Sequence, residues 1–426
     1  MKFAAAFLAS VALATLVPAS AFAQAHADTV DPRVPTQLPR TAIPHHYALS
    51  VTPNAQQLTF DGKVAIDVEV IKATQTLVLN AADLRIASAT LQPAGGGAAQ
   101  TARITLDAKA QTATLAFPKA ITTGSYRLTI AYSGKINTQA NGLFALDYKN
   151  KEGKDARSLF TQFEAADARR FVPSWDEPDY KATWDLTAIV PANQMAVSNM
   201  PAAASKPAGA GLKEVRFQTT PIMSSYLLFF ASGDFDRVTK QAGGREVGIV
   251  TSRGNGDKAG TALDAEAQIL PYYNDYFGTP YPLPKLDNVG GPGQSQFFSA
   301  MENWGAIFTF EYAILDDPAI TSEGQRKTSS APKLMRWRTS GLAISSPWRG
   351  GTTCGSTRVS PAGWRPRRPN ISIRTGAPTW TVSVLAKARC ARTPSNRPIR
   401  LSNRCGLSNR PTRHSTPSPI PRANRS

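Results

Sequence analysis

The sequence predicts a mixed fold: an all-β N-terminal domain, the start of a mixed α/β domain, and a basic tail without regular structure. Three observations predict it. Short runs of β-branched and aromatic residues, separated by Asp, Asn and Gly, fill residues 43–250. Apolar residues at helical spacing follow after residue 260. From residue 327 onward, periodicity disappears and no acidic residue occurs.

The first residues are typical of a secretory signal peptide over residues 1–23. Lys2 supplies the positive charge, Ala4 to Val17 form a short apolar run, and Ala21 to Ala23 offer small residues for cleavage. The apolar run is too short for a membrane span, and no later segment is long enough. We therefore expect a secreted or periplasmic protein. The absence of cysteine from residues 1–326 suits a periplasmic protein that needs no disulfides.

Residues 36–250 are expected to form the β domain. Many short strands without intervening helices favour an antiparallel sandwich or a large curved sheet. A stretch rich in Gly and charge, residues 241–260, is the expected boundary. The strands are expected at Tyr47 to Val51, Val64 to Ile71, Thr76 to Leu79, Ala113 to Phe117, Tyr126 to Tyr132, Lys181 to Val190 and Tyr226 to Ala231.

Residues 258–326 are expected to open a second domain of mixed α/β character. Ala262 to Phe277 has the apolar spacing of a helix, and Gly278 follows as a stop. Pro271 inside this run is expected to kink or split the helix. Prolines at 280, 282 and 284 then predict an extended link into Lys285 to Val289.

The formal net charge of +18 is not spread evenly along the chain. Residues 1–326 carry 28 Lys and Arg against 30 Asp and Glu. Residues 327–426 carry 20 Lys and Arg and no Asp or Glu. The three cysteines (Cys354, Cys390 and Cys405) also lie in the tail. Low hydrophobicity with charge of one sign predicts disorder for residues 327–426. Arg is dispersed among Pro and Ser, and Trp follows no pattern, so we expect no nucleic-acid partner.

Two segments carry the most specific signal. They are Thr161-Gln162-Phe163-Glu164, followed by Ala168-Arg169-Arg170 and Pro173-Ser174-Trp175-Asp176-Glu177-Pro178, and Ser299-Ala300-Met301-Glu302-Asn303-Trp304-Gly305. In order and separation they resemble the exopeptidase signatures of the aminopeptidase N family of zinc metallopeptidases, of the gluzincin type. Ser299 stands where that family has glycine. The resemblance implies a saddle-like β sandwich followed by the start of a thermolysin-like catalytic domain.

The resemblance also implies roles for individual residues. Glu302 and Glu164 would bind the free α-ammonium group of a peptide through charge-assisted hydrogen bonds. Gln162 would line the pocket for the first side chain, and backbone groups at Ala300 and Met301 would align the peptide as an added strand. Asn303 matches the signature as it stands. The alternative is that Glu302 and Asn303 are polar residues at an exposed strand end; Asp176-Glu177-Pro178 is expected to be a structural turn.

The family's chemistry requires zinc, held by two His one helical turn apart and a more distant Glu. This chain has four histidines (His26, His45, His46 and His414), and none has His-Glu-x-x-His spacing. His45 and His46 are adjacent, so they are expected to point to different sides of an extended chain as a solvated loop pair. We therefore expect no zinc ligand and no catalytic residue in this chain as read.

We expect a shift of reading frame to be the cause of the missing motif. Across Met335 to Trp364, the same bases read one position earlier permit His-Glu-Met-Ala-His-Gln-Trp-Phe-Gly and later Trp-Leu-Asn-Glu-Gly. The codons centred on Thr339 and Arg358 are separated by eighteen others, which is the family's spacing from the second His to the ligand Glu. The break is expected between Gln325 and Leu334, which makes residues 327–426 an out-of-frame tail.

Three functions follow as candidates. The first is a zinc aminopeptidase that removes N-terminal residues from peptides, inactive in this chain as read. The second is a secreted, non-catalytic module that binds peptides with a free N-terminus. The third is a binder of anionic polymers through the basic tail. The sequence does not determine the oligomeric state.

Overall fold

The structure is a computed structural model, which describes residues 36–294, 299–316, 370–375 and 377–383. The predicted signal peptide, residues 1–23, and most of the predicted tail lie outside these ranges. The mixed fold predicted from the sequence is confirmed: β sheets come first, and a helix beside a further sheet follows. Among the described residues, no helix combines the length and the apolar character that crossing a bilayer requires.

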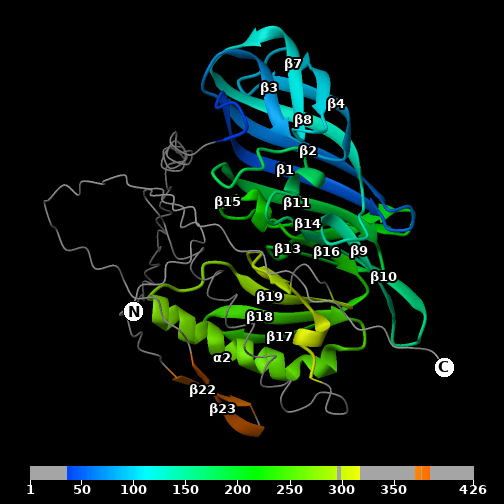
Figure 1. The fold of residues 1–426 in the computed structure, drawn as a ribbon, viewed down its shortest axis with the longest axis vertical. Coiled ribbons are helices and arrows are strands. Elements are labelled where there is room, and N and C mark those ends of the chain that lie inside the picture. The colour runs from blue at the N-terminus through cyan, green and yellow to red at the C-terminus, as the bar shows by residue number, and fades with distance from the viewer. Residues whose placement is uncertain (1–35, 295–298, 317–369, 376, 384–426) are drawn as a thin grey trace, which may run out of the picture. The chain divides into compact units, whose positions relative to one another are not determined.

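The largest sheet carries most of the N-terminal domain (Figure 1). Its strands follow the order β13-β14-β11-β1-β2-β8-β4-β5, and β15 also pairs with β11. All its ladders are antiparallel except that between β1 and β11. The strands are β1 (Ala42–Asn54), β2 (Thr59–Val70), β4 (Leu84–Pro93), β5 (Gln100–Thr101), β8 (Gly124–Lys135), β11 (Lys181–Pro191), β13 (Ala202–Gly209), β14 (Leu212–Phe217) and β15 (Met223–Ser224).

Alternation along these strands decides which side chains enter the core. In β2, every second residue from Phe60 to Val70 is buried, while the residues between them are partly or fully exposed. This period of two is what a sheet with one buried face requires. The apolar side chains join one core with those of a smaller sheet of order β3-β7-β6, formed by β3 (Thr74–Asn80), β6 (Arg103–Asp107) and β7 (Thr112–Ile121).

A third sheet runs in the order β12-β16-β10-β9 and supports the candidate site. It contains β9 (Gly142–Lys149), β10 (Asp155–Gln162), β12 (Met195–Ser198) and β16 (Phe230–Gly233). The sequence predicts a strand from Tyr226 to Ala231, which is wrong in its first half. Residues Ser225–Leu227 form a 3₁₀ turn, η2, and the strand β16 begins only at Phe230.

The fourth sheet has the order β17-β18-β19-β21-β20. It contains β17 (Phe235–Ala242), β18 (Arg245–Ser252), β19 (Lys285–Gly291), β20 (Ala300–Met301) and β21 (Ala306–Phe310). Strands β17 and β18 precede residue 258, yet β18 pairs directly with β19. The expected boundary at residues 241–260 therefore falls inside this sheet. Two of the glycines in that stretch, Gly243 and Gly244, form the hairpin turn between β17 and β18.

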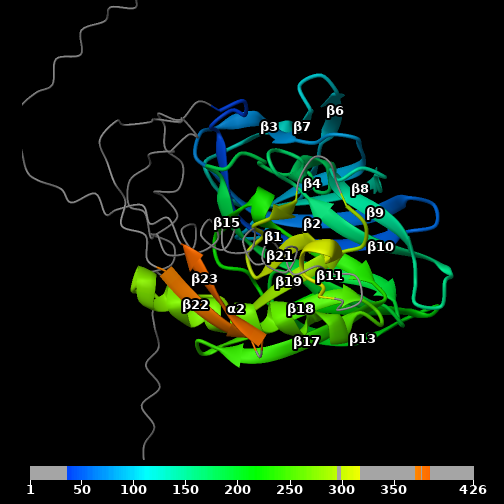
Figure 2. The ribbon, with the colours of Figure 1, turned by 60° about the horizontal axis from the view of Figure 1, so that its bottom comes forward.

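Helix α2 (Gly260–Phe277) lies along β17 and β18 (Figures 1 and 2). Its end is as predicted: Gly278 adopts a left-handed φ of 65°, and its N–H bonds back to Asn274 and Asp275. Pro271 lies inside the helix, which continues through it rather than splitting. The short 3₁₀ turns are η1 (Ala168–Arg170), η3 (Gly256–Ala259) and η4 (Glu311–Ala313).

Part of the predicted disordered tail has regular structure. Strands β22 (Asn370–Thr375) and β23 (Ala377–Ser383) form an antiparallel pair. The rest of residues 327–426 lies outside the described ranges, so disorder of the tail stays a prediction. Ile371, Ile373, Trp380 and Val382 occur at alternate positions, which is the pattern of a strand.

Candidate functional site

The segment Ala300 to Asn303 lies at the edge of the fourth sheet. Ala300 and Met301 form β20 and pair with Thr309 and Phe308 of β21. Met301 is fully buried in a core that includes Phe308, which fixes the end of the strand. Glu302 follows at once and is partly exposed, whereas Asn303 is buried. The predicted strand end is thus present, with Glu302 at its rim.

Gln162 and Glu164 lie at the end of β10 in the third sheet. Gln162 is the last residue of the strand and is buried, with its Oε1 accepting no hydrogen bond from any described residue. Phe163 is completely buried against Phe171, so the next residue, Glu164, emerges at the surface. A buried amide oxygen without a partner is costly, and such atoms are expected where a ligand or water supplies the donor.

The side chain of Tyr226 is affected by both Glu164 and Glu302. Burial raises the pKa of the Tyr226 phenol, and the negative charges of Glu302 and Glu164 raise that pKa further. Both carboxylates therefore lie close enough to the same ring to act on its ionisation. The ring packs against both apolar cores. Sequence reasoning missed Tyr226 as a site residue, because its only signal there was membership of an apolar run.

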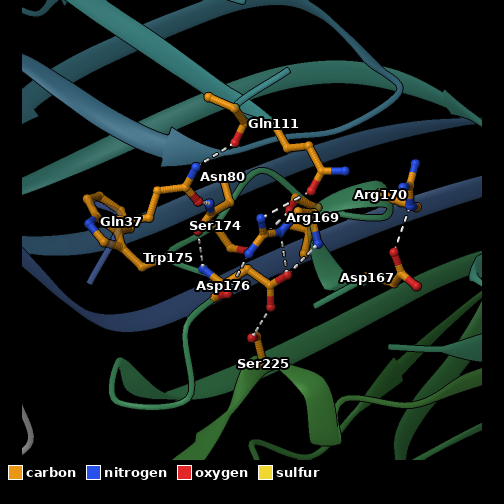
Figure 3. Close-up of polar contacts among 12 residues, drawn as sticks. Gln37, Asn80, Gln111, Asp167, Arg169, Arg170, Ser174, Trp175, Asp176 and Ser225 are labelled. Atoms are coloured by element: carbon orange, nitrogen blue, oxygen red, sulfur yellow. Dashed lines mark hydrogen bonds and ion pairs between the residues drawn. The ribbon is translucent and has the colours of Figure 1, made fainter. Parts of the chain in front are cut away.

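The backbone that follows Glu164 is fixed by a buried polar cluster, shown in Figure 3. Asp176 accepts hydrogen bonds from the Arg169 backbone N–H at 3.1 Å and from its Nε at 3.0 Å. The other carboxylate oxygen of Asp176 accepts from the Ser225 hydroxyl. Ser225 directly precedes Tyr226. The Asp176 carboxylate therefore connects Arg169, in the segment after Glu164, to the segment that carries the Tyr226 ring.

The Asp176-Glu177-Pro178 segment is a turn, as predicted. The Tyr180 N–H bonds to the Glu177 carbonyl at 3.0 Å. The Glu177 carboxylate accepts from the backbone N–H groups of Gln37 and Leu38 at 2.9 and 3.1 Å. These contacts hold the start of the described chain against the β domain, which is a structural role.

The adjacent histidines point to different partners. The Nε2 of His45 lies 3.1 Å from Glu69, while the Nδ1 of His46 lies 2.8 Å from the Thr183 hydroxyl. They lie inside strand β1 rather than in a loop before the sandwich, so the expectation of a loop pair is wrong. Within the described ranges, no three His, Cys, Asp or Glu side chains gather in a way that could hold a metal ion. The described residues thus do not fit a zinc site.

Comparison with known proteins gives the chain a family context. Residues 43–227 match the model of the peptidase M1 N-terminal domain, and residues 261–331 match that of the peptidase family M1 domain. Aminopeptidase N of Acetobacter pasteurianus is 43% identical over 286 residues, which cover 67% of this chain and 79% of that protein.

Two longer relatives match over a smaller share of their length. Puromycin-sensitive aminopeptidase of Caenorhabditis elegans is 36% identical over 292 residues, 68% of this chain and 31% of that protein. Endoplasmic reticulum aminopeptidase 1 of Homo sapiens is 32% identical over 318 residues, 74% of this chain and 33% of that protein. The chain thus spans about a third of the length of these two relatives.

Proposed function

This chain belongs to peptidase family M1, and from that membership we propose that its described part binds the free amino terminus of a peptide between Glu164 and Glu302. The single observation that carries the proposal is the position of Tyr226, whose ring packs against both apolar cores and whose pKa is raised by burial and by the charges of Glu302 and Glu164. Two carboxylates beside one partly buried ring attract an ammonium group and offer it charge-assisted hydrogen bonds. The edge strand β20 offers backbone groups with which the peptide would pair.

The neighbouring groups support the same assignment. The buried Oε1 of Gln162 has no donor among the described residues, so a peptide N–H or an ordered water would satisfy it. An acetylated peptide has no ammonium charge and leaves both carboxylates without that partner. We therefore expect selectivity for the free amine over its acetylated form, expressed as the ratio of the two dissociation constants.

The experiment measures binding of a fluorescent peptide with a free or an acetylated N-terminus by fluorescence anisotropy. Glu164→Gln and Glu302→Gln should each reduce the selectivity about tenfold, because each removes one charge-assisted hydrogen bond. Glu69→Gln is the matched control, since Glu69 is a partly exposed carboxylate that contacts His45. A wild-type chain that binds both peptides equally would refute the proposal.

Peptidase family M1 is a zinc metallopeptidase family, and bound zinc would supply an activated water in an intact member. The four histidines of this chain have the wrong spacing for that site. We therefore derive no catalytic step through zinc, and we propose that this chain as read releases no amino acids from peptides. Zinc analysis of the purified chain and an aminoacyl chromogenic substrate test this directly. Stoichiometric zinc with chelator-sensitive cleavage would contradict it.

A break in the reading frame between Gln325 and Leu334 is our proposed cause of the missing site. The match to the catalytic family model stops at residue 331, inside this interval, which supports the proposal. The complete loss of acidic residues after residue 326 supports it as well. We further propose that residues 1–23 direct export, so that the protein acts outside the cytoplasm; N-terminal sequencing of the protein from its host tests this.

A further inference from the structure

Glu164 and Glu302 belong to different sheets, so their separation depends on how those sheets are docked. Glu164 follows β10 of the third sheet, and Glu302 follows β20 of the fourth. The sheets pack through aromatic rings, with the centroids of Phe160 and Phe229 lying 5.0 and 6.2 Å from that of Phe308. Apolar packing is not directional, so it does not by itself fix the position of the Glu302 loop, residues 302–305.

Asn199 supplies a directional contact between the two layers. It follows β12 in the third sheet and is buried. Its Nδ2 donates to the carbonyl of Leu227 and to the carbonyl of Trp304, each at 2.8 Å. Its Oδ1 accepts from the Phe229 N–H at 2.8 Å. Both amide hydrogens are thus used, one on each side of the boundary between the layers.

The Glu302 loop approaches Asn199 closely along the backbone as well. Gly305 has a φ of +71°, and a Cβ built on it would lie 2.0 Å from the carbonyl oxygen of Asn199. Only glycine permits this approach. On its other side, the Gly305 carbonyl accepts from the Lys285 Nζ at 2.7 Å and from the Asp287 N–H at 3.0 Å.

We infer that Asn199 is a positioning residue that sets the location of Glu302 relative to Glu164 and Tyr226. The inference rests on the proposed binding of a peptide amine. The Asn199 amide hydrogen-bonds to the backbone of Leu227 and Phe229, which follow Tyr226 in the chain. The same amide donates to the carbonyl of Trp304, two residues after Glu302. Loss of the amide removes the hydrogen bond to Trp304, while both carboxylates, the contacts of the Gly305 carbonyl and the aromatic packing on Phe308 remain.

Asn199→Ala tests the inference, and Ser198→Ala is its matched control. The Ser198 hydroxyl is also buried, but it donates to the Phe229 carbonyl at 2.7 Å, on the same side of the boundary as Ser198 itself. Two measurements are made on the full chain: hydrogen exchange of a peptide spanning the Glu302 loop, and selectivity for a free over an acetylated peptide N-terminus. Thermal unfolding compares the stability of the two variants.

Asn199→Ala should speed exchange in the Glu302 loop about tenfold, the effect of losing one well-formed hydrogen bond. It should also lower the free-amine selectivity about tenfold, since small misplacement of a binding group costs at least that much. Ser198→Ala should change both values less than about twofold. Unchanged exchange in Asn199→Ala, or equal effects of both variants at equal stability, would overturn the inference.

Gly305→Ala gives an independent test that keeps the Asn199 side chain. The added methyl group cannot coexist with the Asn199 carbonyl, so the Glu302 loop must move away, and exchange and selectivity should change as in Asn199→Ala. Normal values in a folded Gly305→Ala chain would also overturn the inference. If the wild-type chain itself shows no free-amine selectivity, the proposed function fails, whereas the exchange data still show whether Asn199 holds the loop.

Discussion

Arg169 and Asp176 form a buried ion pair that closes the chain between them into a compact loop. The Nε of Arg169 donates to the Asp176 carboxylate at 3.0 Å, and its NH2 group donates to the Asp176 carbonyl at 2.9 Å. Only 9% of the arginine and 2% of the aspartate side chain is exposed. A charge buried to this degree is tolerated only while its partner is present.

Asp176→Ala is therefore expected to lower the free energy of unfolding by about 3–5 kcal/mol, the cost of leaving one buried charge unpaired. Urea denaturation followed by circular dichroism measures the change. The control is Asp67→Ala, because Asp67 pairs with Arg127 on the surface and such pairs contribute about 0–1 kcal/mol. Equal losses in the two variants would show that burial of the Arg169 pair has no special cost.

Most of the β domain could be predicted because one buried face imposes a period of two along each strand. The helix predicted over residues 262–277 followed from apolar spacing of the same kind, and the structure begins it at Gly260. Its end at Gly278 followed from glycine's tolerance of a positive φ. The start of the fourth sheet was not predicted. Its first strands, β17 and β18, form a hairpin whose partner β19 lies more than thirty residues later, a distant pairing that local sequence does not reveal.

The candidate site was predicted only in part. Glu164 and Glu302 could be named because their neighbours form specific motifs, but nothing local shows that their segments meet. Asn199 donates a hydrogen bond to the Trp304 carbonyl, and the charge of Glu302 raises the pKa of Tyr226. These interactions join segments about eighty to a hundred residues apart, so neither motif nor periodicity identifies them.

The pKa of Tyr226 gives a direct test of the arrangement around the site. Because Glu302 and Glu164 both raise that pKa, Glu302→Gln should lower it, and Glu164→Gln should lower it by a smaller amount. The measurement is ¹³C NMR titration of tyrosine Cζ, with Tyr226→Phe to identify the resonance. Glu69→Gln should leave it unchanged. A Tyr226 pKa that responds to neither site variant would show that the carboxylates do not share this ring.

Glu311 is expected to make stability depend on pH with a definite sign. Burial raises the pKa of Glu311, and hydrogen bonds from Ser252 and Asn255 lower it by less. The folded state thus binds this proton more tightly than the unfolded state. Its contribution to stability is complete below about pH 4.3, the ordinary glutamate value, and is lost as pH rises through the higher folded pKa.

Glu311→Gln should therefore remove a decline in unfolding free energy above about pH 4.3, as measured by urea denaturation at a series of pH values. Asp147 provides a control of opposite sign. A hydrogen bond from Arg157 lowers its pKa, so its contribution is present above the unfolded value and is lost as pH falls. If the difference between wild type and Glu311→Gln does not change with pH, Glu311 titrates alike in both states.

Restoring the reading frame is the most demanding prediction. Deep sequencing of codons 320–370 should reveal one base gained or lost near Gln325 to Leu334, because only a shift converts the codons around Met335 and Thr339 into two histidines with an intervening glutamate. A chain expressed from the corrected gene should bind one zinc ion and cleave aminoacyl substrates, with loss of activity on chelation. The uncorrected chain should keep the same thermal midpoint with and without chelator, since its described residues offer no metal cluster. If the corrected gene gives a chain that binds no zinc, the shifted codons do not encode a metal site; the loss of acidic residues after residue 326 would then need another cause.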